Sequence, residues 1–246
     1  HCGAVDTQIA GISCHIIPGL SAFVGGDITA GILACQMLEQ EEPMLLIDLG
    51  TNGEMALGNR QKLCACATAA GPAFEGGANR GIWGADMVKL LQKLLEEGLM
   101  DRQGLLKEPY FTKGIRIGDV LVTKEAVRAV QLAKGAIAAG IEILTESYGI
   151  RLSDISKVVL AGGFGYYLDP KAAAAIGLLP KELTDRTVTG GNTALSGAAL
   201  VGNRMLTGQL RAWDDLHRRQ ELQIQILNLA EQVKFTETFL KKMDFC

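Results

Sequence analysis

The sequence lacks an excess of basic residues. Its 246 residues include 24 Lys and Arg against 27 Asp and Glu, which gives a formal net charge of -3. Nucleic acids and anionic membrane surfaces attract proteins through a basic field, and this composition provides none. We therefore expect neither nucleic acid nor a membrane as a partner.

Long apolar runs and a signal-peptide pattern are also missing. Glycine, proline or charge interrupts each apolar run within about ten residues, whereas a membrane-spanning helix needs roughly 20. These features predict a cytoplasmic protein without a membrane span. The first residue is His1 rather than methionine, which suggests a fragment of a longer protein.

The six cysteines form no C-x-x-C pair and no framework typical of disulfides. Cys64 and Cys66 stand two apart in KLCACATAA, so a strand would place both on one face. They could be thiolate ligands, but a metal or cluster needs about four ligands and no others are near in sequence. We expect small core residues here, in a reducing cytoplasm.

The residues that are present favour an α/β fold. Hydrophobic residues make up 48% of the chain, which is enough for a substantial core. Three short strands are predicted at 44–48, 54–59 and 62–69, the first two joined by a type I′ turn at Asn52 and Gly53. A strand followed by glycines at 157–165 and an edge strand at 222–226 come later.

Helical patterns alternate with these strands. Asp27 is expected to cap a helix that runs to about residue 40, and a helix at 87–95 should stop at Gly98. Residues 124–148 form a long amphipathic pattern between a Thr123 cap and a Gly149 stop. Further helices are expected from about Asn192 and at 235–243. The chain thus has a strand meander first, followed by helices that alternate with strands. This order indicates an α/β domain.

The stretch LLIDLGTNGE (45–54) could hold phosphate. Gly50 and Gly53 let a ligand approach the backbone, and successive N–H groups with the Thr51 hydroxyl would line a concavity. Asp48 could hold Mg²⁺ directly or through water. No Walker-type loop occurs in the chain. Taken alone, the stretch fits an ordinary Asn-Gly hairpin as well.

Two further segments have a similar double interpretation. The glycines of AGGFG (161–165) would let a flat ring such as adenine lie on the backbone, or they form a simple turn. The small residues of GGNTALSGAAL (190–200) would let two helices cross closely at a hinge, or they serve tight packing alone.

In this order the three segments resemble the second half of the actin, Hsp70 and sugar-kinase (ASKHA) superfamily: its second phosphate loop, adenosine motif and second connecting helix. The chain more closely resembles the C-terminal ASKHA domain of RACo-type proteins, the reductive activators of corrinoid proteins. The segments that carry this resemblance are FVGGDITAGIL (23–33), LIDLGTNGEMALGN (46–59), CATAAGPAFEGGAN (66–79), QLAKGAI (131–137), VLAGGFGYYLD (159–169), IGLLP (176–180) and GNTALSGA (191–198).

The resemblance implies an actin/Hsp70/sugar-kinase-like (ribonuclease H-like) α/β fold, a mixed sheet with flanking helices. Residues 1–43 would be the end of the first ASKHA subdomain with its connecting helix, and 44–246 the second, nucleotide-binding subdomain. Members of the family use ATP to reduce Co(II) corrinoid to Co(I), with electrons from a [2Fe-2S] ferredoxin-like domain. The implied partner is a corrinoid protein of a methyltransferase system, and a homodimer is possible.

The resemblance also implies a set of site residues. It assigns Asp48 and Glu75 to catalysis, with Asp48 also near Mg²⁺. Glu75 of AGPAFEG would orient water or a ribose hydroxyl, or merely cap a helix. The residues expected to bind ATP are Gly50, Thr51, Asn52, Gly53, Gly162, Gly163 and Phe164.

Some features depart from the family or stay open. The ferredoxin-like domain and the first phosphate loop are absent from this chain, so ATPase activity is expected of the full-length protein and only weakly, if at all, of this chain. The segment that leads to Trp83 is shorter than in relatives. Gln131 and Lys134 lie in a family-like segment, yet a solvated helix face would explain them equally well.

Two other function classes remain. A small-molecule kinase of the same fold would need a carboxylate base near an acceptor hydroxyl. A non-catalytic docking or dimerisation module would need no nucleotide site. A cluster-binding cysteine run upstream would favour the activator, and its absence would reopen the kinase.

Overall fold

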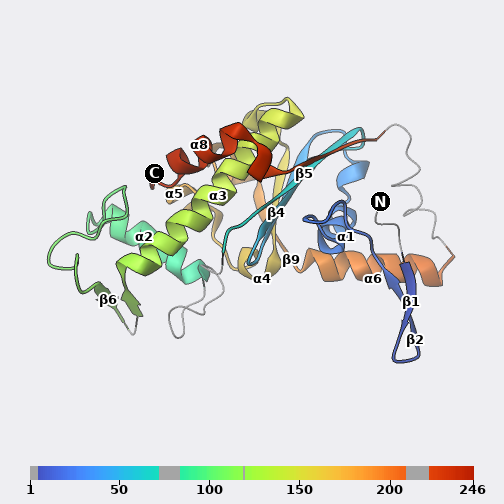
Figure 1. Ribbon diagram of the computed structural model, residues 1–246, viewed down its shortest axis with the longest axis horizontal. Coiled ribbons are helices and arrows are strands. Elements are labelled where there is room, and N and C mark those ends of the chain that lie inside the picture. Colours follow the sequence, from blue (N-terminus) through green and yellow to red (C-terminus); the bar gives the residue numbers. More distant parts are fainter. Residues whose placement is uncertain (1–4, 72–83, 119, 209–221) are drawn as a thin grey trace.

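The computed structural model describes residues 5–71, 84–118, 120–208 and 222–246. A six-stranded mixed sheet in the order β10-β5-β4-β3-β8-β9 forms its centre, with helices on both faces (Figure 1). The expected α/β fold, a mixed sheet with flanking helices, is confirmed.

The predicted strands of this sheet are all present, and β9 was not predicted. β3 (Met44–Leu49), β4 (Gly53–Gly58) and β5 (Lys62–Thr68) form the antiparallel meander. β8 (Lys157–Ala161) runs parallel to β3, and β9 (Thr187–Gly191) runs parallel to β8. β10 (Gln223–Leu227) is the predicted late edge strand and pairs in parallel with β5.

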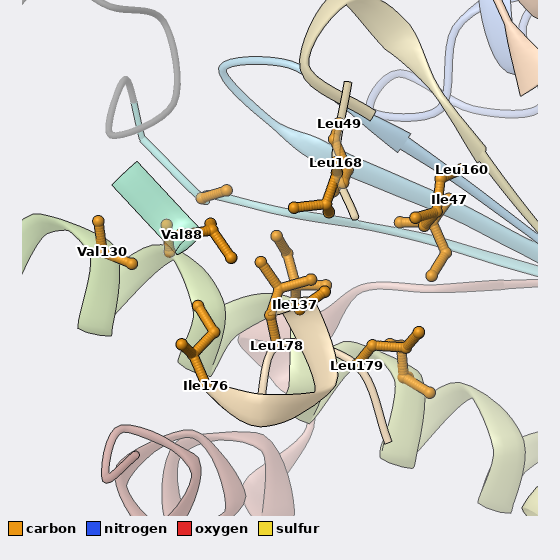
Figure 2. Close-up of a cluster of buried hydrophobic side chains, with 14 of the residues drawn as sticks. Ile47, Leu49, Val88, Val130, Ile137, Leu160, Leu168, Ile176, Leu178 and Leu179 are labelled. Atoms are coloured by element: carbon orange, nitrogen blue, oxygen red, sulfur yellow. The ribbon is translucent and has the colours of Figure 1, made fainter. Parts of the chain in front are cut away.

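The long helix α3 (Lys124–Tyr148) covers one face of the sheet. The Thr123 hydroxyl oxygen accepts a hydrogen bond from the Ala126 N–H, and Gly149 ends the helix with φ of 88°, as predicted. Helices α2 (Gly84–Glu96), α5 (Pro170–Ala175) and α8 (Val233–Lys242) lie on the same side. Figure 2 shows the core between these elements, with labelled side chains of Ile47, Leu49, Val88, Val130, Ile137, Leu160, Leu168, Ile176, Leu178 and Leu179.

Helices α1 (Gly26–Ala34) and α6 (Thr193–Leu206) lie on the other face. Leu46 and the alternate strand residues pack there against Ile28 and Ile32. The two helices touch at small residues, because a Cβ added at Gly197 would overlap the main-chain oxygen of Ala30. The predicted close crossing of two helices is therefore confirmed.

The prediction for the first helix was wrong at both ends. Gly25 is the N-cap, and Asp27 lies inside the first turn with its Oδ1 2.8 Å from the Ile28 N–H that donates to it. The helix ends at Ala34, and Gln36 with φ of 52° separates it from the 3₁₀ turn η1 (Met37–Glu39). The apolar pattern continues through this break, which is why the sequence suggested one longer helix.

The remaining elements are short. β1 (Val5–Ile9) with β2 (Ile12–Ile16) and β6 (Ile115–Ile117) with β7 (Val120–Val122) form two hairpins. The short helices are η3 (Leu152–Asp154), α4 (Gly162–Gly165), η4 (Lys181–Arg186) and η5 (Leu229–Glu231). None of the helices in the described ranges is long and apolar enough to cross a membrane. The division of the chain at residue 43 stays a prediction.

Candidate functional site

The predicted phosphate loop is a hairpin with a three-residue connection. Leu49 pairs with Gly53, and the Gly50 N–H donates to the Asn52 carbonyl oxygen at 2.9 Å. The expected type I′ turn is wrong, because neither Asn52 nor Gly53 has a positive φ. A Cβ at Gly53 would lie 2.9 Å from the Thr68 hydroxyl, so this glycine permits close packing within the sheet.

Three carboxylates influence one another electrostatically beside this hairpin, on the α1 side of the sheet. Asp48 and Glu54 are cross-strand partners of β3 and β4. Burial raises the pKa of Asp48 to about 6, and the negative charge of Asp27 adds to the rise. Burial, followed by Asp27 and Asp48, also raises the pKa of Glu54. The site thus concentrates negative charge that a bound cation would relieve.

Glu54 and Asp27 were not assigned to the site from the sequence. Glu54 lies in the quoted hairpin, directly opposite Asp48. Side chains of opposite residues in an antiparallel pair lie on the same face, so this pairing could have indicated that Glu54 belongs to the site. Asp27 was interpreted only as a cap, since nothing local shows that α1 brings it near the sheet.

The adenosine-like segment lies directly against the hairpin. Asp48 pairs with Ala161 at the end of β8, and Gly162 follows with φ of 83°. A Cβ at Gly162 would overlap the Asp48 carboxylate and lie 2.7 Å from the Leu49 carbonyl oxygen. Gly163 is exposed, with no atom within 4 Å of the position of a Cβ. Two motifs more than 100 residues apart in sequence therefore form one site with open space beside it.

The aromatic side chains near this segment differ in what they offer a ligand. Phe164 is buried in the main hydrophobic core, so its backbone rather than its ring faces the site. Tyr166 and Tyr167 are exposed and meet edge to face at 4.9 Å between ring centroids. The Tyr166 ring lies 3.6 Å from the position of a Cβ at Gly191, the residue that pairs with Ala161. These tyrosines follow AGGFG directly, and their position beside the glycines was the signal that sequence reasoning missed.

The donor set suits Mg²⁺ bound together with phosphate. Mg²⁺ uses one or two carboxylates and completes its shell with water and phosphate oxygens. Asp48 is half-buried at the strand end, and Thr51 and Asn52 are exposed on the loop beside it. Among the residues that the structure describes, no three His, Cys, Asp or Glu side chains are grouped to hold a metal alone. The residues therefore fit Mg²⁺ as part of a nucleotide complex.

Some expected residues lie elsewhere or outside the description. Glu75 and Trp83 lie outside the described residues, so the role of each stays a prediction. Cys64 and Cys66 are fully buried, and burial raises the pKa of Cys66 to about 12. They are neutral core thiols, as expected.

Gln131 and Lys134 are buried, so the solvated-face interpretation was wrong. Gln131 Nε2 donates to the Gln103 carbonyl oxygen at 2.9 Å, and Lys134 Nζ donates to the main-chain oxygen of Asp244. Both side chains therefore face into the fold, toward the C-terminal segment.

Comparison with known proteins places this geometry in a family. The family model for the C-terminal ASKHA domain of RACo matches residues 42–80 and 77–246. A solved structure, "Reductive activator for corrinoid,iron-sulfur protein", superposes with a TM-score of 0.80 and 28% identity. That match covers 95% of this chain and 44% of the other.

Two named relatives are similar in sequence. "Corrinoid activation enzyme RamQ" of Eubacterium limosum is 33% identical over an alignment 287 positions long. The alignment covers 93% of this chain and 47% of the relative. "[Co(II) methylated amine-specific corrinoid protein] reductase" of Methanosarcina barkeri is 24% identical over 285 residues, 95% of this chain and 52% of the relative. The chain thus spans about half the length of these relatives. It belongs to the family of C-terminal ASKHA domains of RACo-type proteins.

Proposed function

We propose that this chain is the nucleotide-binding domain of an ATP-dependent reductive activator of corrinoid proteins. ATP binding and hydrolysis would promote reduction of Co(II) to Co(I), with the electron supplied by a ferredoxin-like domain outside this chain. The names of the relatives support the activity. The observation that carries the nucleotide role is the direct contact between the Asp48 hairpin and Gly162.

The site residues divide into a phosphate side and a base side. Gly50, Thr51, Asn52 and Gly53 would bind phosphate oxygens through backbone N–H groups and side chains. Gly162 and Gly163 would let the adenine ring lie near the backbone of α4, with the backbone of Phe164 beside it. Asp48 would hold Mg²⁺, which neutralises charge on the phosphates when it is bound.

The surrounding carboxylates set the form in which the nucleotide binds. Asp27, Asp48 and Glu54 make the potential at the hairpin negative. A bare triphosphate would be repelled there, whereas its Mg²⁺ complex brings the neutralising cation. We therefore propose that the domain binds MgATP and MgADP much more tightly than the free nucleotides.

Coupling to a partner would use the crossing of α1 and α6. Nucleotide that binds an open and a closed arrangement with different affinity shifts their populations. The proposed partner is a corrinoid protein of a methyltransferase system, in the cytoplasm, where thiols stay reduced. A homodimer stays a prediction.

Calorimetric titration with MgATP and MgADP tests the nucleotide role. Asp48→Ala should remove the Mg²⁺ ligand, and Gly163→Val should fill the open space beside the backbone. Both should weaken binding at least about ten-fold, or 1.4 kcal/mol. Gly202→Ala, in α6 with open space at the Cβ position, is the control. Unchanged affinity in both site variants would contradict the proposed site.

A chimera tests the activation step separately. This chain would replace the matching half of the Eubacterium limosum relative, and the Co(I) absorption of a corrinoid protein would be followed with ATP and a reductant. We expect ATP-dependent Co(I) formation that Asp48→Ala abolishes. A chimera that binds MgATP but never yields Co(I) would argue against the activator and leave the nucleotide site standing.

A further inference from the structure

A cavity of about 700 Å³ lies between α3, η3, η4 and the C-terminal segment. Its volume is within the usual range for sites that enclose a small ligand. Apolar side chains form much of its lining, among them Ile141, Ile150, Leu152 and Leu179. The cavity shares no lining residue with the nucleotide site, so that function does not explain it.

Lys134 forms part of the wall and is 1% exposed. Its ammonium group has one main-chain acceptor, the Asp244 oxygen, and lies 5.2 Å from the centre of the Phe245 ring. Within the described ranges, it has no ion pair with a carboxylate. An ammonium group has three donors, so this environment leaves hydrogen-bonding capacity toward the cavity.

Burial makes the charged form of Lys134 less favourable in free energy than it would be in water. Burial lowers its pKa to about 8, and the nearby Cys246 and Asp244 oppose that decrease. At neutral pH the side chain therefore remains mostly charged. Buried charges in proteins are generally paired, and an anion in the cavity would supply the missing partner.

Most of the other charges of the lining are paired or exposed. Glu142 pairs with Lys242, Glu146 with Lys234, and Lys241 with Glu237 outside the lining. Three further cations in the described part of the wall, Arg102, Lys134 and Lys181, face the carboxylates of Glu182 and Asp244 and the negative charge of Cys246. Of these three cations only Lys134 is buried, so an anion in the cavity would act mainly on Lys134.

Gly177 packs directly against the charged end of the cavity. Its φ is 76°, and a Cβ there would lie 3.2 Å from Lys134 Nζ and 2.7 Å from Cys246 Sγ. A side chain at this position would overlap Cys246 and crowd the ammonium group. The glycine thus allows Lys134 and Cys246 to lie where they do in the wall.

We propose that this cavity binds a small organic monocarboxylate, whose carboxylate pairs with Lys134 and whose apolar body lies against Ile141, Ile150 and Leu179. The alternative is that Lys134 only anchors the C-terminal segment through Asp244. That role would not need the apolar lining of a cavity of this volume.

Benzoate and its neutral counterpart benzamide are suitable probes for NMR titration of the isoleucine methyl groups. We expect saturable shifts at Ile141 and Ile150 with benzoate, and none at Ile28 on the opposite face of the sheet. Benzamide should bind at least about ten-fold more weakly, since it has no charge for Lys134. Equal binding of both probes, or no shifts with benzoate, would overturn the proposal.

Variants separate ligand binding from anchoring. Lys134→Met should reduce benzoate affinity at least about ten-fold, whereas Lys241→Met, at the cavity but paired with Glu237, should not. Because Lys134→Met also removes an internal contact, Ile150→Trp provides a second test that fills the cavity and leaves Lys134 in place. Unchanged benzoate affinity in Ile150→Trp would refute the site even if Lys134→Met failed to fold.

Discussion

Gly162 lies so close to Asp48 that a Cβ at Gly162 would overlap the Asp48 carboxylate. The contact joins the end of β8 to the end of β3, which are parallel neighbours. Ligands of α/β sheets bind outside the carboxyl ends of such strands. The proposed nucleotide site lies at this edge, and it depends on a glycine at residue 162.

Gly162→Ala should destabilise the domain and displace Asp48. The positive φ alone costs about 1–2 kcal/mol for an alanine, and the overlap with Asp48 adds to it. We expect a loss of about 3 kcal/mol in urea unfolding. The neighbouring Gly163→Ala meets no atom within 4 Å and should change stability by less than about 1 kcal/mol. Similar losses in the two variants would contradict the close contact.

Asp48→Asn should change how stability depends on pH. The folded state raises the pKa of Asp48 from 3.8 to about 6, so it binds the proton more tightly than the unfolded chain. The stability that Asp48 gains from this tighter proton binding is fully present below its pKa in the unfolded chain, 3.8. It is lost as the pH rises through about 6. After allowance for partial exposure, the charged form costs about 1–2 kcal/mol.

The wild type should therefore lose stability relative to Asp48→Asn between about pH 4 and pH 7. Urea unfolding of both proteins across this range measures the difference. Removal of an exposed carboxylate by Asp185→Asn controls for the change in net charge. A difference that stays constant across the range would show that Asp48 does not titrate as described.

Much of the fold could be predicted because its signals are local. The Thr123 cap and the Gly149 stop fixed α3 correctly at both ends, and period-two patterns located the meander. The break after Ala34 was missed, since the apolar pattern of α1 continues into η1.

The site was predicted less completely because its parts meet only in three dimensions. Residues within recognisable motifs, such as Asp48 and Gly162, were identified. Asp27 reaches the same place through the packing of α1, and no spacing in the sequence indicates that. Lys134 shows the same limit: its helix pattern cannot reveal that residues 243–246 cover it 110 positions later.

Tyr166 should contribute to binding of the base. Its exposed ring lies one helical turn beyond Gly162 and rests against Gly191. An aromatic contact is worth about 1 kcal/mol beyond buried area, so Tyr166→Ala should raise the Kd for MgADP roughly five- to ten-fold. Tyr166→Phe keeps the ring and should bind like the wild type. If both variants bind equally well, the ring does not contact the nucleotide.

Alanine substitution at two glycines of α6 should change the stability of the domain in opposite directions. Gly197 packs on the Ala30 carbonyl oxygen, where a Cβ would overlap main-chain atoms of α1. Gly202 lies one and a half turns later with no atom within 4 Å of a Cβ. Gly197→Ala should therefore destabilise the domain by about 2–3 kcal/mol through forced separation of the helices.

Gly202→Ala should instead stabilise by about 0.5–1 kcal/mol, because alanine loses less backbone freedom in a helix. Urea unfolding of both variants provides the comparison within one helix. Stabilisation by both substitutions would mean that α1 and α6 do not cross as closely as the structure shows. If Gly197→Ala also weakens MgATP binding while Gly202→Ala does not, the crossing and the nucleotide site are energetically coupled, as the proposed activation requires.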